Sequence, residues 1–275
     1  MKKFFYVATI LCLLINFTAY SKEYRQIVSL APSVTKSLYE LGCEQFIKGI
    51  TTYCPKGTTE KYIIGTFLDP DVEKIILLDP DLIIVTKDGN NKTVTEKLVQ
   101  LGFEVHTVEA AENFNDICIN YHTLANKLNK IKIAKEQIEI AKCSLKTIYK
   151  KLNKFDKSKL FWEIGTHPLY TVGNKSFIND YNYYTKTINV YEDVNMRYFA
   201  VSIDDIVERN PDIMVFVNIR PNTSEIKNWN KYKNVEAVKN NKIFMLDSDD
   251  IFSSTPLTFV ESVKMLTKII YGDVV

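Results

Sequence analysis

The chain has 275 residues, of which 46% are hydrophobic and 25% are charged. This composition excludes a mainly disordered chain, a collagen-like repeat and a small disulfide-stapled protein, and the length is sufficient for two modest cores. The 35 Lys and Arg residues nearly balance the 33 Asp and Glu residues. The chain therefore lacks the one-sided basic composition of non-specific nucleic-acid binders, and no nucleic-acid partner is expected.

The first 21 residues read as an export signal. Lys2 and Lys3 precede an apolar run over residues 4–15, and small residues at Ala19 and Ser21 offer a cleavage site after Ser21. The sequence therefore predicts a signal peptide over 1–21 and a periplasmic or otherwise extracytoplasmic protein.

Two alternatives for this segment stay open. A membrane anchor is disfavoured because the apolar run is shorter than a bilayer span and Asn16 interrupts it. Lipoprotein processing at Cys12 ranks lower because the bulky Leu11 precedes that cysteine. Attachment to the membrane through a lipid is kept as an alternative to free secretion.

Four cysteines follow the signal: Cys43, Cys54, Cys118 and Cys143. Export permits disulfides, but four cysteines allow three pairings, and their spacing matches no zinc motif. We interpret them as packing residues, with Cys43–Cys54 as the one candidate bridge, and no metal site of the protein's own is predicted.

Short β-branched runs alternate with helix-length segments along the chain. We predict strands over 26–30, 46–50, 82–86, 104–108, 159–164, 213–217 and 243–246, and a closing helix over 256–271. This alternation indicates an α/β protein with mainly parallel sheets.

One long amphipathic helix is predicted over 130–153. Its apolar residues recur at steps of three and four, and they are Ile131, Ala134, Ile138, Ala141, Leu145, Ile148 and Leu152. Three heptads could also form a coiled-coil dimer, but a single stripe inside an α/β chain favours packing on the chain's own domains, so a monomer is expected.

An internal repeat flanks this helix. Residues 72–85 (VEKIILLDPDLIIV) align without a gap on residues 203–216 (IDDIVERNPDIMVF). In each copy a short helix ends near an Asx-Pro-Asp turn and a buried strand follows. The predicted fold is therefore two similar α/β lobes joined by one long α-helix, with an N-terminal lobe over 22–128, the linker helix over 129–155 and a C-terminal lobe over 156–275.

The chain resembles the substrate-binding proteins of ABC importers, in the class whose lobes are joined by a rigid helix. The residues that carry the resemblance are 27–33 (IVSLAPS), 49–53 (GITTY), 65–67 (GTF), 73–85, 165–173 (GTHPLYTVG), 201–215 and 253–256 (SSTP). The resemblance implies capture of a bulky metal-containing nutrient, which is cobalamin, a ferric siderophore or haem, for delivery to an ABC permease dimer in the cytoplasmic membrane. No cofactor is expected, because cobalt or iron would belong to the ligand.

The resemblance also implies where the permease docks. In this family one acid on each lobe contacts arginines of the permease, and the matching positions are Glu73 and Asp204, which the internal repeat also makes equivalent. The plainer alternative is that each is an acid in the first turn of a helix, where the helix dipole favours it. Asp204 is shorter than the glutamate usual at its position.

Ligand is expected at the carboxyl ends of the strands, where two facing lobes form a cleft. The stretch 161–199 holds ten aromatic residues, about twice the number that the overall 12% predicts, and aromatic faces suit a large conjugated ligand. The candidate ligand-binding residues in the cleft loops are Tyr53, Phe67, His167, Tyr170, Tyr198, Arg220 and Ser253. His167 could donate a hydrogen bond to a ligand or, with a tyrosine, ligate an iron porphyrin. The forked guanidinium of Arg220 could bind a carboxylate or phosphate of the ligand. A solvated loop histidine is the favoured explanation for His167, and Arg220 could equally be a solvated charge.

Other classes of function have less support. The sequence contains no G-x-S-x-G elbow, H-E-x-x-H helix, P-loop or G-x-G-x-x-G motif, so no enzyme activity is predicted and a hydrolase stays a minor alternative. A zinc or manganese carrier would need three or four convergent ligands, of which only His167 is well placed.

Overall fold

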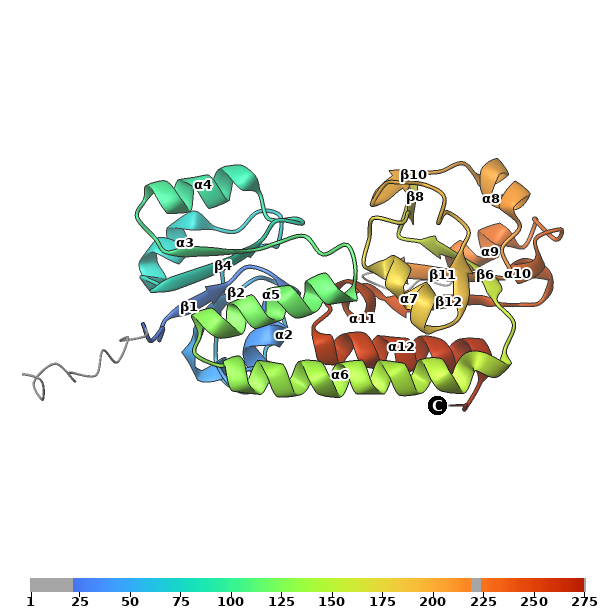
Figure 1. The fold of residues 1–275 in the computed structure, drawn as a ribbon. Coiled ribbons are helices and arrows are strands. Elements are labelled where there is room, and N and C mark those ends of the chain that lie inside the picture. Colours follow the sequence, from blue (N-terminus) through green and yellow to red (C-terminus); the bar gives the residue numbers. More distant parts are fainter. Residues whose placement is uncertain (1–21, 219–223, 275) are drawn as a thin grey trace, which may run out of the picture.

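The computed structural model describes residues 22–218 and 224–274, and within them the chain forms two α/β lobes side by side (Figure 1). The first lobe has a five-stranded parallel sheet in the order β3-β2-β1-β4-β5. Its strands are β1 (Ile27–Ser29), β2 (Ile47–Ile50), β3 (Tyr62–Ile63), β4 (Leu82–Thr86) and β5 (Val105–Val108). Its helices are α2 (Pro32–Glu40), α3 (Val72–Leu78), α4 (Lys92–Gln100) and α5 (Phe114–Lys127).

The second lobe has a four-stranded parallel sheet in the order β12-β11-β6-β9 and a small antiparallel sheet in the order β10-β8-β7. Its strands are β6 (Ser158–Glu163), β7 (Gly165–Thr166), β8 (Leu169–Val172), β9 (Thr187–Asn189), β10 (Tyr198–Ala200), β11 (Ile213–Asn218) and β12 (Ile243–Asp247). Its helices are α7 (Ile178–Tyr184), α8 (Ile203–Arg209), α9 (Ser224–Trp229), α10 (Glu236–Lys239), α11 (Ser248–Phe252) and α12 (Pro256–Tyr271). All seven predicted strands are present, and the closing helix has the predicted bounds.

The internal repeat is one structural unit used twice. α3 and α8 each end on a residue in the left-handed conformation, Asp79 with φ 42° and Asn210 with φ 47°. After the proline, the next aspartate of each copy accepts backbone hydrogen bonds at the start of the neighbouring strand: Asp81 from Arg25 and Gln26, just before β1, and Asp212 from Lys159 of β6. The turn therefore fixes β4 beside β1, and β11 beside β6, in the same way, which confirms two lobes of similar design.

The central strands β4 and β11 are buried on both faces, as parallel sheets covered by helices require. Alternate residues of β11 belong to different apolar clusters, with Val215 in one and Met214 and Phe216 in the other. The first of these clusters extends through both lobes and includes residues of α2, α5, α6 and α12. Each lobe also has a smaller apolar cluster on the other face of its sheet. That cluster lies under α3 and α4 in the first lobe and under α8 and α10 in the second.

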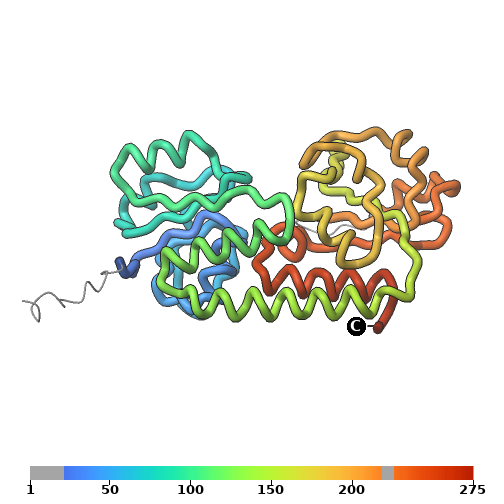
Figure 2. The backbone as a smooth tube through the Cα atoms, viewed as in Figure 1, coloured from blue at the N-terminus to red at the C-terminus, as the bar shows by residue number. Residues whose placement is uncertain are grey.

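The long helix α6 (Ile131–Lys151) connects the lobes and runs below both of them (Figure 1). Its predicted stripe is buried along its length, for example at Ala134, Ala141 and Ile148. The C-terminal helix α12 lies against α6 under the second lobe, so the linker is two helices thick there (Figure 2). The intramolecular interpretation of the stripe is thereby supported, because this face packs on the chain itself.

The start of the described chain is held by a charged cluster on the first lobe. Glu104 accepts hydrogen bonds from Lys22 at 2.5 Å, from Lys127 at 2.6 Å and from the hydroxyl of Tyr24. These three donors, Lys127 foremost, lower the pKa of Glu104 to about 2. The carboxylate therefore links the N-terminal segment to α5.

The four cysteines of the described chain are free, and three of them are buried. The candidate bridge Cys43–Cys54 is not formed: the Sγ of Cys54 lies 3.1 Å from the Oγ1 of Thr51, and Cys43 contacts the carbonyl of Leu41. Across residues 22–218 and 224–274, no helix is both long and apolar enough to span a bilayer. The predicted signal peptide and Cys12 lie outside the described residues.

Candidate ligand-binding cleft

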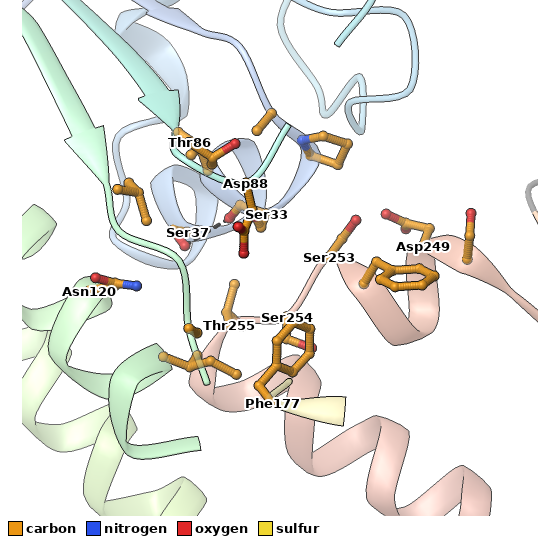
Figure 3. Close-up of a pocket in the computed structure, with 18 of the residues that line it drawn as sticks. Ser33, Ser37, Thr86, Asp88, Asn120, Phe177, Asp249, Ser253, Ser254 and Thr255 are labelled. Carbon is orange, nitrogen blue, oxygen red and sulfur yellow. Dashed lines mark hydrogen bonds between the residues drawn. The ribbon is translucent and has the colours of Figure 1, made fainter. Parts of the chain in front are cut away.

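A cavity of about 910 Å³ lies between the two lobes, lined from both sides by segments that follow the parallel strands. The first lobe contributes the ends of β4 and β5, residues after β1, β2, β3, β4 and β5, and one face of α5. The second lobe contributes residues after β6 and β12, the last residues of β11, Tyr198 of β10, the start of α7 and the turn before α12. In Figure 3, Ser33, Thr86 and Asp88 of the first lobe face Asp249, Ser253 and Ser254 of the second. The cavity is therefore at the carboxyl ends of both parallel sheets, where a cleft was expected from the sequence.

One amide organises the wall of the first lobe. The Oδ1 of Asn90 accepts hydrogen bonds from the backbone N–H of Thr86 at 2.7 Å and from its hydroxyl at 3.2 Å. The Nδ2 of Asn90 donates to the carbonyl of Phe67 at 2.8 Å and to that of Leu30 at 3.1 Å. A single side chain therefore holds together the segments that follow β1, β3 and β4, each of which lines the cavity.

The residue before this amide is a glycine for a physical reason. Gly89 has φ +124°, a conformation that side chains with a Cβ rarely adopt. A Cβ built on it would lie 2.2 Å from Cε1 of Phe67, which lines the cavity. Gly89 therefore lets the ring of Phe67 pack against the backbone.

Three aromatic side chains line the cavity from the second lobe: Tyr198, Phe252 and Phe177. Tyr198 packs edge to face on Phe252, with ring centroids 6.3 Å apart, and its hydroxyl accepts a hydrogen bond from Ser176 at 3.3 Å. Burial raises the pKa of Tyr198, so the phenol stays neutral. Phe177, at the start of α7, is buried and adds a third ring. The wall can accept the face of a large conjugated or apolar ligand.

Ion pairs join the lobes at the cavity. Asp88 follows β4 and pairs with Arg197 of the second lobe, and Lys36 of α2 pairs with Asp249 of α11 at 2.9 Å. Burial raises the pKa of Asp88, and Arg197 opposes that shift. The carboxylates of both pairs line the cavity, whereas the two cations do not.

A half-buried carboxylate connects the lobes next to the cavity-lining residue Thr255. Glu40, at the end of α2, accepts a hydrogen bond at 2.7 Å from the hydroxyl of Thr255, which also caps α12. Burial raises the pKa of Glu40, and its second oxygen is buried without a hydrogen-bond partner among the described residues. Thr255 therefore both starts α12 and ties it to the first lobe.

The N-terminus of α2 also faces the cavity. Its N-cap is Ala31, which gives no side-chain cap, and Ser33 and Val34 in its first turn line the cavity. The partial positive charge at such a terminus favours an anion by about 0.3–1 kcal/mol. This is a weak contribution to the electrostatics of the site.

The structure brings four of the seven predicted ligand residues to the cavity: Tyr53, Phe67, Tyr198 and Ser253. His167 and Tyr170 do not line it, because the chain after β6 turns into the small antiparallel sheet, where Tyr170 pairs with Gly165 and Ala200 and is 40% exposed. Arg220 lies outside the described residues. None of the seven has been tested as a ligand contact, and each stays a prediction.

The two predicted docking acids occupy equivalent places. Glu73 lies in the first turn of α3 and Asp204 in the first turn of α8, and both are exposed. Figure 1 shows both helices on the side of their sheets away from α6. Within the described residues neither carboxylate takes part in an ion pair, so both are available to a partner.

No group of three or more His, Cys, Asp or Glu side chains within the described residues is arranged to hold a metal ion. The cavity is lined instead by rings, aliphatic side chains, hydroxyls and a few carboxylates. Such a lining suits capture of an organic ligand.

Comparison with known proteins identifies the family. Residues 27–249 match the family described as periplasmic binding protein, and the chain belongs to it. The family consists of transport binding proteins rather than enzymes and places the chain outside the cytoplasm, in agreement with the sequence-based prediction.

Individual relatives agree with this assignment. The uncharacterized ABC transporter substrate-binding lipoprotein YvrC of Bacillus subtilis (strain 168) is 27% identical over 260 residues, which cover 92% of this chain and 82% of that protein. The vitamin B12-binding protein of Vibrio parahaemolyticus serotype O3:K6 is 25% identical over 246 residues, with 88% of each chain covered. Among solved structures, a possible iron-binding (periplasmic solute-binding) protein from Staphylococcus epidermidis superposes with a TM-score of 0.79 at 28% identity, covering 91% of this chain and all of that one.

Proposed function

We propose that the protein is the substrate-binding component of an ABC importer and binds a bulky metal-containing nutrient, namely cobalamin, a ferric siderophore or haem, in the cavity between its lobes. The observation that carries the proposal is the cavity itself, about 910 Å³ in volume and lined by both lobes at the ends of their strands. Small-molecule sites typically have about 300–1,000 Å³, so this one suits a large ligand. Relatives named for vitamin B12 and for iron support the choice of ligand.

Binding would be tested by titrating the purified mature protein with cyanocobalamin, haem and a panel of ferric siderophores, with intrinsic fluorescence as the signal. Tyr53 lines the cavity and is 53% exposed, whereas Tyr62 is 68% exposed and lies outside it. We expect Tyr53→Ala to weaken binding about threefold to tenfold, the contribution of one aromatic contact, and Tyr62→Ala to leave it unchanged. Equal effects of the two substitutions, or no binding of any probe, would count against the proposed site.

Delivery is proposed to use Glu73 and Asp204, one acid on each lobe, against basic residues of the permease. The equivalent positions of the two acids in the repeat suit a permease built as a dimer. We expect the double variant Glu73→Arg and Asp204→Arg to abolish uptake in cells while ligand affinity stays within twofold. Glu96→Arg on α4, an exposed acid outside the repeat, serves as the matched control and should transport normally. Normal uptake by the double variant would refute the docking role.

A further inference from the structure

Among residues 22–218 and 224–274, the charged side chains that line the cavity are all of one sign. Among its described lining residues there are four carboxylates, of Asp88, Glu109, Asp247 and Asp249, and no lysine, arginine or histidine. The carboxylates come from both lobes, so a ligand in the cavity meets them on two sides.

The cations that neutralise three of these acids are already engaged and stand outside the lining. Arg197 pairs with Asp88, and Lys36 pairs with Asp249. Lys87 likewise pairs with Glu109 at 2.8 Å, and these cations would have to break their pairs to reach an anionic ligand.

Acceptor oxygens remain available at the second lobe. Asp247 has no ion-pair partner within the described residues. It is the N-cap of α11, and its Oδ1 accepts the backbone N–H of Asp249 in the first turn of that helix. The Oδ1 of Asp249 is buried and lacks a hydrogen-bond partner in the part of the chain that the structure describes. A buried acceptor without a donor is unfavourable, and a rotation of the Asp249 side chain that exposes this oxygen would let it accept a ligand N–H or O–H.

We propose that the cavity selects a neutral or cationic ligand that presents hydrogen-bond donors, such as amide or amine groups, and discriminates against ligands whose buried part carries carboxylates or other anions. This rests on the proposed function and narrows it: an amide-bearing corrinoid or a hydroxamate complex of iron fits the lining, whereas the two propionates of haem or a triply negative catecholate complex would face carboxylates. Within the part of the chain that the structure describes, the partial charge at the N-terminus of α2 opposes this selection, and it is weaker than the full charges of the acids.

The test holds ligand shape constant and varies charge. Three probes would be titrated: the iron(III) complex of desferrioxamine B, which is a cation, its N-acetyl form, which is neutral, and its N-succinyl form, which is an anion. A second pair is cyanocobalamin and its monocarboxylic acid, and a third is haem and haem dimethyl ester. For whichever series binds, we expect the anionic member to bind about tenfold more weakly than its neutral counterpart, because one added charge lies near several carboxylates in a partly desolvated site.

Variants separate the effect of the site from general effects. The anion penalty is the ratio of the Kd of the anionic member to the Kd of its neutral counterpart. Asp247→Asn keeps an acceptor that can cap α11 and should reduce this penalty about threefold. Asp250→Asn is the matched control, since Asp250 is exposed and outside the lining, and should leave the penalty unchanged. An anionic member that binds as tightly as its counterpart, or a penalty unaffected by Asp247→Asn, would overturn the charge selection while leaving the carrier function intact. Failure of all three series to bind would instead refute the proposed ligand class.

Discussion

Asn90 should be the most sensitive position in the wall of the first lobe. Asn90→Ala removes four hydrogen bonds that hold three cavity-lining segments together. One acceptor that loses its donor is the carbonyl of Leu30, a fully buried residue. At about 0.5–1.5 kcal/mol for each bond, and with allowance for partial exposure, the loss is about 2–4 kcal/mol of unfolding free energy. In a chain of this size such a loss lowers the thermal midpoint by roughly 5–15 °C.

Thermal unfolding followed by circular dichroism would measure this effect, and ligand titration would show whether the displaced segments also weaken binding. Asn90→Asp keeps the acceptor for Thr86 but places a carboxylate against two carbonyl oxygens, so it should be at least as destabilising. Asn115→Ala, on the exposed surface of α5, is the control and should shift the midpoint by no more than about 2 °C. A midpoint of Asn90→Ala equal to that of the control would refute the organising role.

Four further predictions concern stability, reactivity and motion. The pKa of Glu104 is about 2 in the folded chain and about 4.5 when the carboxyl is free, so its ion pairs contribute about 1 kcal/mol to the unfolding free energy, discounted for exposure. This contribution is present above pH 4.5 and is lost as the pH falls toward 2. Glu104→Gln should therefore make the unfolding free energy, measured in urea titrations, less dependent on pH over that interval. In the folded mature protein a thiol reagent should label Cys143 alone within minutes, and rapid labelling of the three buried cysteines would contradict the packing. Thr255→Ala should cost about 1–2 kcal/mol in urea unfolding, through lost capping of α12 and the lost contact with the first lobe, whereas Thr255→Ser should be near neutral. Small-angle scattering should show no large compaction when ligand is added, and a clear fall in the radius of gyration would contradict the coupling of the lobes.

The sequence predicted the features that depend on local periodicity. Two-sided burial makes a strand such as β4 a continuous apolar run, and the steps of three and four along α6 locate a helix buried on one face. The repeat was readable because the Asx-Pro-Asp turn performs the same task in both lobes, as the bonds of Asp81 and Asp212 show.

The features that the sequence did not predict depend on tertiary contacts. The antiparallel sheet β10-β8-β7 has strands of two to four residues, too short for a periodic signal, and it carries His167 and Tyr170 away from the cavity. Asn90 sits in a stretch whose composition, with Gly89 beside it, indicates only a turn. Which carbonyls its amide reaches is decided by strands more than 20 residues away along the chain.

The way the lobes are joined limits how the cavity can open. A loop hinge can rotate without loss of packing, but here the lobes share an apolar cluster that continues from α2 and α5 through α6 to α12. α6 has 21 residues and is therefore about 30 Å long, and bending it would break backbone hydrogen bonds as well as that packing. The pairs Asp88–Arg197 and Lys36–Asp249 at the cavity are, by contrast, partly exposed, so each can separate while a ligand enters and form again afterwards. Ligand entry should accordingly proceed through these side chains and the segments beside them, over a scaffold whose two lobes keep their relative position.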